Sequence, residues 1–202
     1  MPRRKPAEDR KADIVAATLA LADRIGPDRL TTNHVAREVG VTQAAIFRHF
    51  PTKAELWAAV GEALSQRLTT AWDEALAAHA TPRARLRALI RTQLRQIEAC
   101  PALPAILHSR ELGVDNAALR ESCRSLVVRF QGHLAANLQV LADTGGLRAD
   151  LPPEDAASLL VSLVQGLAIR WTLGARNFAI EDEGLRLLDL QLALFSGKEA
   201  GP

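Results

Sequence analysis

The sequence has 202 residues, of which 48% are apolar and 24% are charged, an ordinary composition for a soluble globular protein of one or two domains. Its two cysteines, Cys100 and Cys123, exclude a disulfide framework and form no metal-ligand spacing. The net charge of +2 is unevenly distributed, because residues 1–53 carry ten Lys and Arg against six Asp and Glu, a balance of +4, whereas the remainder carries fifteen against seventeen, a balance of −2.

An N-terminal excess of positive charge is typical of a module that contacts phosphates. Residues 1–6 form a basic arm, for which DNA contact and disorder are equally open interpretations. No apolar segment follows Arg3, Arg4 and Lys5, so the sequence predicts no secretory signal. The longest apolar stretch, residues 156–169, is too short to span a bilayer. We therefore expect a cytoplasmic protein without a membrane segment.

A first helix is predicted over residues 8–25, where apolar side chains recur at helical spacing until a Gly-Pro pair ends it. Thr31 and Thr32 then offer hydroxyl groups that can cap the start of a second helix. Gly40 can adopt the positive φ that ends a helix and reverses the chain. These signals predict a first helix over residues 8–25 and a second helix that starts near Thr32 and ends in a tight turn at Gly40.

Thr42 is positioned to cap a third, short helix. Ile46 and Phe50 are four residues apart and face inward, while the opposite face carries small and hydrogen-bonding side chains. A short helix, a glycine turn and a second helix with such an outer face form a helix-turn-helix. Over residues 11–57 the sequence resembles the DNA-binding core of TetR-type transcriptional repressors.

The resemblance implies that the second helix of the motif enters the major groove of DNA. Together with the helix starts on either side, it gives these candidate DNA-binding residues: Thr32, Thr42, Gln43, Ala44, Ala45, Phe47, Arg48, His49 and Lys53.

Different contacts are expected of these side chains. Gln43 can pair with adenine through its amide group, and Arg48 can bind guanine or a phosphate. Thr32, Thr42 and Lys53 lie at helix N-termini, where phosphates bind readily. Alternatively, Arg48 is a solvated surface charge and the threonines are helix caps alone.

Two residues depart from the family pattern. Phe47 stands where these repressors usually have tyrosine, and it lacks the hydroxyl that commonly reaches a phosphate. Ala22 stands where the family often has phenylalanine. We expect Ile25 and Leu30 to fill the space that this smaller residue leaves.

Beyond Pro51 the sequence predicts helices at residues 53–79 and 82–100, a short segment at 102–112, and helices at 116–144, 154–173 and 182–195. The fold class is therefore all-α, with about nine helices in the order of the TetR-type plan. We expect two domains: residues 1–52, a helix-turn-helix DNA-binding domain with the basic arm, and residues 53–202, a helical ligand-binding and dimerisation domain.

The helix at residues 154–173 is apolar around most of its circumference and needs cover on several sides. The resemblance implies that the last two helices and their two-fold copies form a four-helix dimer interface, with a monomer of large core as the alternative. The expected interface residues are Leu160, Leu163, Val164, Leu167, Trp171, Leu185, Leu188, Leu192 and Phe195.

The resemblance also implies a ligand cavity among the middle helices. Its candidate lining residues are Trp72, Gln93, Leu94, Ile97, Leu103, Ile106, Leu107, His108, Phe130, His133, Leu134 and Asn137. Each of these is alternatively an ordinary core or surface residue, so the prediction concerns a largely apolar pocket as a whole.

Four arginines, Arg83, Arg87, Arg91 and Arg95, follow one another at four-residue spacing. Like charges at this spacing destabilise a helix by about 0.2–0.5 kcal/mol per pair, so acidic partners or water must compensate. A solvated face is the favoured interpretation, and a site for an anion or an acidic protein is the alternative.

These patterns predict a homodimeric repressor that binds a pseudo-palindromic operator in double-stranded DNA and releases it when a small, largely apolar effector binds. We expect no cofactor and no metal. One alternative keeps DNA binding but lacks a small-molecule effector, as in an architectural protein or one that a protein partner controls. An all-helical enzyme is disfavoured, because no nucleophile–base or metal-ligand spacing is present.

Overall fold

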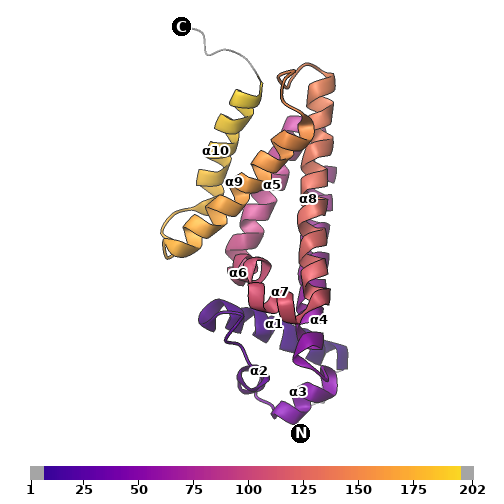
Figure 1. Ribbon diagram of the computed structural model, residues 1–202, viewed down its shortest axis with the longest axis vertical. Coiled ribbons are helices and arrows are strands. Elements are labelled where there is room, and N and C mark those ends of the chain that lie inside the picture. Colours follow the sequence, from indigo (N-terminus) through magenta and orange to yellow (C-terminus); the bar gives the residue numbers. More distant parts are fainter. Residues whose placement is uncertain (1–6, 197–202) are drawn as a thin grey trace. The chain divides into compact units, whose positions relative to one another are not determined.

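The computed structural model of the chain describes residues 7–196, except for the side chains of Ala7, Arg110 and Glu111, and in this range it contains ten α-helices and no β-strand (Figure 1). The helices are α1 (Ala7–Ile25), α2 (Thr32–Val39), α3 (Gln43–His49), α4 (Lys53–Ala77), α5 (Pro82–Ala99), α6 (Ala102–His108), α7 (Arg110–Asp115), α8 (Ala117–Asp143), α9 (Pro153–Leu173) and α10 (Ile180–Phe195). The prediction of an all-α fold is confirmed. The basic arm at residues 1–6 lies outside the described residues.

Capping and helix-ending residues explain the bounds of several helices. Asn116 caps α8, since its Oδ1 accepts a hydrogen bond from the Leu119 N–H at 3.0 Å. Gly145 follows the end of α8 with a φ of 70°, the left-handed conformation that glycine adopts without strain. Pro153 is the first residue of α9, where its missing N–H costs no helical hydrogen bond.

The short segment predicted at residues 102–112 forms two helices, which accounts for ten helices where about nine were expected. Ser109 separates α6 from α7, because its backbone is extended, with φ −68° and ψ 115°. Its hydroxyl oxygen accepts a hydrogen bond from the Leu112 N–H at 3.0 Å and so caps the start of α7.

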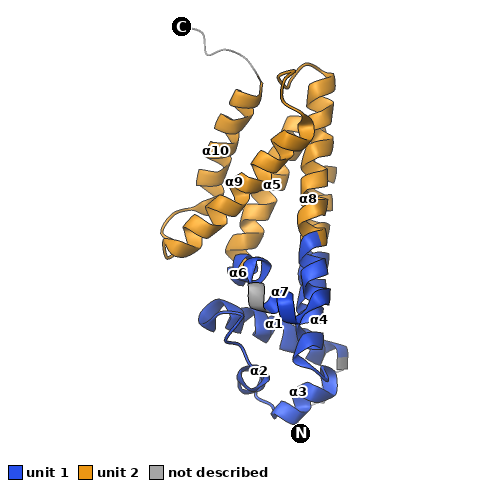
Figure 2. Cartoon of the chain, in the orientation of Figure 1, with its two compact units in different colours: residues 1–67, 100–124 blue, residues 68–99, 125–202 orange. Residues whose placement is uncertain are grey.

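Packing divides the chain into two compact units (Figure 2). The first comprises residues 1–67 and 100–124, and the second comprises residues 68–99 and 125–202. The long helices α4 and α8 each contribute to both units. Packing alone therefore groups the chain differently from a cut after residue 52, and the functional division into residues 1–52 and 53–202 stays a prediction.

The first unit holds the three N-terminal helices, in which α1 packs against α2, α3 and α6. Ile14, Leu30 and Ile46 are fully buried at the centre of this bundle. Ala22 is also buried. Of the two residues expected to fill the space beside it, Leu30 is fully buried and Ile25 is 36% exposed, and their packing against Ala22 stays a prediction. The amide of Asn116 donates a hydrogen bond to the Ala54 carbonyl at 2.8 Å, which joins the start of α8 to α4.

In the second unit α5, α9 and α10 pack against one another. Gly184 permits the close approach of α10, because a Cβ at this position would lie 2.2 Å from Leu94 Cδ1 and 3.2 Å from Leu167 Cδ1. Helix α9 has 21 residues and is long and apolar enough to cross a membrane by length and composition alone. In the structure α9 packs against α5 and α10.

The four-residue arginine repeat lies on α5, and α10 supplies acidic partners for three of its members. Arg87 forms an ion pair with Asp189, while Arg91 and Arg95 both contact Glu181, with N–O distances of 3.2 and 2.7 Å. The repulsion along α5 is therefore offset by carboxylates of a neighbouring helix as well as by water. The repeat belongs to the α5–α10 contact.

Candidate nucleic-acid interface

The start of α2 is fixed by a reciprocal pair of hydrogen bonds. The Thr31 hydroxyl oxygen accepts from the His34 N–H, and His34 Nδ1 accepts from the Thr31 N–H, both at 3.3 Å. This is a capping box in which histidine takes the place of the usual glutamate or glutamine. Thr31 is thus the N-cap residue, and Thr32 is the first residue of the helix.

The turn between α2 and α3 depends on Gly40. Its φ of 72° and ψ of 36° are left-handed, as the sequence predicts. The N–H groups of Gly40 and Val41 donate to the carbonyls of Arg37 and Ala36 at 3.2 and 2.9 Å. These bonds satisfy the last carbonyls of α2 and reverse the chain within a few residues, so that α3 packs against α2.

Helix α3 is anchored from within and presents its opposite face to solvent. Thr42 caps it, with its hydroxyl oxygen accepting from the Ala45 N–H at 3.2 Å. Ile46 is fully buried and Phe50 nearly so. The predicted DNA-facing residues Ala44, Phe47 and Arg48 are exposed at i, i+3 and i+4 spacing, while Gln43, Ala45 and His49 are half-buried.

The two helices of the motif are joined by a hydrogen bond between side chains. Gln43 Nε2 donates to Thr32 Oγ1 at 2.8 Å. Thr32 is only 8% exposed. The structure thus brings together two of the predicted DNA-binding residues, of which Thr32 is largely buried.

Lys53 is the first residue of α4 and is exposed. Thr52, immediately before it, accepts a hydrogen bond from the Glu55 N–H at 3.0 Å and caps the helix. Free backbone N–H groups and a lysine side chain therefore lie together at one helix N-terminus, an arrangement that favours a phosphate.

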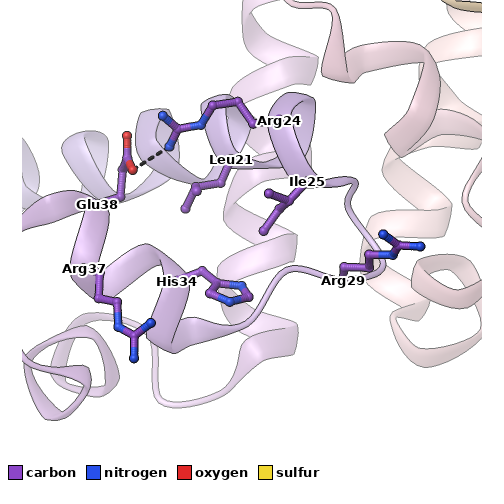
Figure 3. A pocket seen from close by; sticks show the side chains of 7 residues that line it. All are labelled: Leu21, Arg24, Ile25, Arg29, His34, Arg37 and Glu38. Carbon is purple, nitrogen blue, oxygen red and sulfur yellow. Dashed lines mark hydrogen bonds and ion pairs between the residues drawn. The ribbon is translucent and has the colours of Figure 1, made fainter.

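Beside this motif, α1 and α2 border an open groove of about 670 Å³ (Figure 3). Leu21 and Ile25 line it with apolar surface, and Arg24 at its rim forms an ion pair with Glu38. Arg29 and Arg37 also line the groove and have no ion-pair partner within residues 7–196. The groove could not be predicted from the sequence, because its residues come from two helices and the loop between them.

The predicted ligand-pocket residues fall into two groups. In the second unit the centroid of the Trp72 ring lies 5.0 Å from that of Phe130 and 6.3 Å from that of His133. Trp72 Nε1 donates a hydrogen bond to Gln93 Oε1 at 3.0 Å. Asn137 donates to the His133 carbonyl. Leu94, Ile97 and Leu134 are buried in the same unit.

The other four predicted residues, Leu103, Ile106, Leu107 and His108, lie on α6 in the first unit. Leu103 and Ile106 are buried, Leu107 is half-buried and His108 is exposed. Their part in a ligand pocket stays a prediction.

His133 is the titratable group of the Trp72 cluster. Burial lowers the pKa of His133, although Asp73 opposes this effect with a carboxylate oxygen 3.9 Å from His133 Nε2. Burial thus favours the neutral form of the imidazole that stands beside the indole of Trp72.

The predicted dimer-interface residues mostly face the interior of the single chain. Leu163 is half-buried, and the other eight are buried: Leu160, Val164, Leu167, Trp171, Leu185, Leu188, Leu192 and Phe195. The same two helices expose a different apolar set, which comprises Leu159, Ile169, Leu173, Leu190 and Leu194.

Comparisons with known proteins match both parts of the chain. Residues 14–60 match the model of bacterial regulatory proteins of the tetR family, and residues 82–193 match that of the C-terminal part of BetI-type transcriptional repressors. The HTH-type transcriptional regulator BetI of Rhizobium meliloti is 33% identical over 176 residues, which are 85% of this chain and 82% of BetI. The nucleoid occlusion factor SlmA of Marinomonas is 25% identical over 158 residues, or 78% of this chain and 80% of SlmA.

Solved structures agree on the fold. A TetR transcription regulator of Haloarcula marismortui has a TM-score of 0.78 at 22% identity and covers 93% of this chain and 98% of its own. FadR of Bacillus subtilis in complex with stearoyl-CoA has a TM-score of 0.75 at 16% identity and covers 90% of this chain and 97% of its own. A transcriptional regulator of Saccharomonospora viridis in complex with choline has a TM-score of 0.75 at 23% identity and covers 92% of this chain and 96% of its own.

Proposed function

The chain belongs to the TetR family of bacterial regulatory proteins, and from that premise we propose that it is a homodimeric, ligand-responsive repressor of transcription. As a member of this family it is a DNA-binding regulator and not an enzyme. The finer proposal is that each copy lays α3 into the major groove of one half of a pseudo-palindromic operator, in the cytoplasm.

One observation carries this proposal. Helix α3 is held on one side by Ile46 and Phe50 and at its N-terminus by Thr42 and the Gly40 turn. Ala44, Phe47 and Arg48 remain exposed. A short, firmly anchored helix with small and cationic side chains outside suits the major groove, which admits a helix and presents acceptors to arginine.

Dimer formation would use α9 and α10. Leu159, Gly166 and Leu173 follow one another at seven-residue intervals on α9, and all three are exposed. Leu190 and Leu194 lie one turn apart on α10 with 53% and 69% of their surface exposed. We propose that this apolar face meets its two-fold copy, and that the buried residues predicted for the interface support it from behind.

The effector would bind in the C-terminal region, and we propose a small, largely apolar molecule. The cluster of Trp72, Phe130 and His133 offers aromatic surface with a few polar groups, the mixture that small-molecule sites use. FadR with stearoyl-CoA favours an apolar ligand, whereas the Saccharomonospora regulator with choline favours a quaternary ammonium ion, which aromatic faces also attract.

The experiment that tests DNA binding starts from selection of a preferred sequence from random duplexes by the full-length protein. Affinity for that sequence is then measured by fluorescence anisotropy at several salt concentrations. With six to ten phosphate contacts per complex, affinity should fall by about 10³- to 10⁵-fold between 50 and 200 mM salt. No enriched sequence, or an affinity that does not change with salt, would refute the proposal.

A second function is a DNA-binding protein without a small-molecule effector. The SlmA relatives favour it, because they are nucleoid occlusion factors. Thermal unfolding in the presence of fatty acids, acyl-CoA thioesters and quaternary amines separates the two. A ligand that raises the melting temperature and weakens operator binding supports the repressor, and no such ligand in any class supports the second function.

A further inference from the structure

The hydrogen bond between Thr32 and Gln43 gives these residues roles different from those of independent DNA contacts. Thr32 is the first residue of α2 and Gln43 is the first residue of α3, so the bond joins the two helices of the motif at their N-termini. At 2.8 Å it has the length of a well-formed hydrogen bond. Gln43 is half-buried, and Thr32 is 8% exposed.

The bond leaves the recognition groups of the amide available. A glutamine side chain has two N–H donors and one carbonyl acceptor, and the threonine hydroxyl engages only one of the donors. The second donor and Oε1 remain. These are the two groups that a bidentate contact with adenine requires, one for its N7 and one for its N6 amino group.

The bond also restricts Gln43 to the rotamers whose amide reaches Thr32. A free glutamine at a helix surface has several rotamers and two opposite amide orientations, and ordering it on binding costs side-chain entropy. In the observed arrangement Thr32 binds Nε2, and the amide is held near one place on the surface before DNA binds. Preorganisation of this kind lowers the entropy cost of a base contact at that place.

We propose that Thr32 is a positioning residue, which orients Gln43 so that its amide reads adenine in the operator. This inference rests on the proposed function and replaces the phosphate contact expected of Thr32. A phosphate would have to reach a residue that is only 8% exposed and whose hydroxyl already accepts a hydrogen bond from Gln43. The neighbouring N-cap residue Thr31 is exposed and offers a hydroxyl for that role.

The test is a base-preference profile. Full-length wild-type protein, Thr32→Val, Thr32→Ser and Gln43→Ala are each measured against the selected operator and against duplexes with every base pair of one half-site changed in turn. Gln43→Ala should lose the preference for one A·T pair, a discrimination of about 5- to 150-fold for a bidentate contact. Thr32→Val, which keeps the shape but cannot accept the hydrogen bond, should lose most of the preference at that same position and no other.

Thr32→Ser retains the acceptor and should keep the preference. In the double variant Thr32→Val with Gln43→Ala, the profile should match that of Gln43→Ala alone, because both changes remove one contact. Melting temperatures are recorded for each variant, and Thr32→Ala replaces the valine variant if the latter does not fold.

Three results would overturn the inference. If Thr32→Val weakens binding to all duplexes equally and reduces the slope of log affinity against log salt by about one, Thr32 contacts a phosphate. If it lowers the melting temperature and leaves the profile unchanged, Thr32 is purely structural. If Gln43→Ala has an unchanged profile, Gln43 reads no base. A wild-type protein with no sequence preference would instead refute the proposed function itself.

Discussion

At the scale of single residues, the motif separates side chains that hold it together from side chains that remain available. Thr31, Gly40 and Thr42 satisfy the backbone groups at the ends of α2 and α3. Arg48 has no hydrogen-bond or ion-pair partner in the described part of the chain and lies exposed in the last turn of α3. An unpaired guanidinium at this position is ready to bind a phosphate or a guanine.

Replacement of Arg48 by alanine should therefore weaken operator binding by about 1–3 kcal/mol, or roughly 5- to 150-fold, while the oligomeric state stays unchanged. Fluorescence anisotropy with the selected operator measures the loss. Arg83→Ala is a matched control, since Arg83 is an exposed arginine at the start of α5, in the other compact unit. Wild-type affinity in the Arg48 variant, or equal losses in both variants, would contradict the assigned contact.

Residues that act through the local backbone could be predicted from the sequence, because a cap or a glycine turn depends on a few neighbours in the chain. Thr42 and Gly40 are such cases. The Thr32–Gln43 bond could not, since it depends on how α2 and α3 pack and on the rotamers of two side chains eleven residues apart. The groove beside Arg29 and Arg37 was missed for the same reason.

At the scale of helices, α5, α9 and α10 are joined by close packing and by ion pairs. The carboxylate of Glu183 on α10 accepts hydrogen bonds from Arg186 at 2.8 Å and from Arg170 of α9 at 2.9 Å. The four arginines of α5 could be predicted as a stripe, but not their partners, because Glu181 and Asp189 lie about ninety to a hundred residues further along the chain. Nor did the sequence predict that Ser109 would split residues 102–112 into two helices.

The Glu183 cluster predicts a pH dependence of stability. Hydrogen bonds from Arg186 and then Arg170 lower the pKa of Glu183 from 4.5 to about 2. Because the folded-state pKa is depressed, the stabilisation is fully present above about pH 4.5 and is lost as the pH falls toward 2. Since the cluster is exposed to solvent, the effect should shrink in high salt.

Thermal unfolding between pH 5 and 2 measures this effect. Glu183→Gln should have a lower melting temperature than the wild type at pH 5, and the difference should narrow as the pH approaches 2. Glu62→Gln serves as the control, because Glu62 is exposed and forms no ion pair in the range that the structure describes. A constant difference across the pH range would show that Glu183 does not act through its charge.

Gly184 gives a second prediction at this scale. Gly184→Ala would force a methyl group against the buried Leu94 side chain, and overpacking of this kind costs about 1–3 kcal/mol, partly offset by the better helix propensity of alanine. Gly132→Ala on α8 has open space around the added methyl and should stabilise by about 0.5–1 kcal/mol. Denaturant unfolding compares the two, and a stabilised Gly184 variant would show that the α5–α10 contact is loose.

At the scale of the whole molecule, the proposal depends on two copies acting together. The sequence predicts a dimer contact through residues of α9 and α10 that are buried within the single chain, except for the half-buried Leu163. An apolar helix can be buried against its own chain or against a second copy. The hydrophobic pattern of α9 alone does not show which of the two buries it. The structure shows which apolar side chains the single chain leaves exposed, and these are the ones that we propose for the contact.

If α9 and α10 form the dimer, a charge on the exposed face should separate the copies without unfolding them. We expect Leu194→Glu to give monomers in sedimentation experiments and to weaken operator binding, with its helical circular dichroism unchanged. Val128→Glu is the control, since Val128 is similarly exposed but lies on α8. Dimers of normal affinity in the Leu194 variant would place the interface elsewhere.

The most direct measurement is the mass of the complex between wild-type protein and its selected operator, determined by analytical ultracentrifugation at several protein concentrations. The proposed function predicts an even number of chains on each intact operator, and no stable complex with a single half-site at the same concentration. One chain bound to a half-site as tightly as to the full operator would contradict the paired recognition on which the proposal depends.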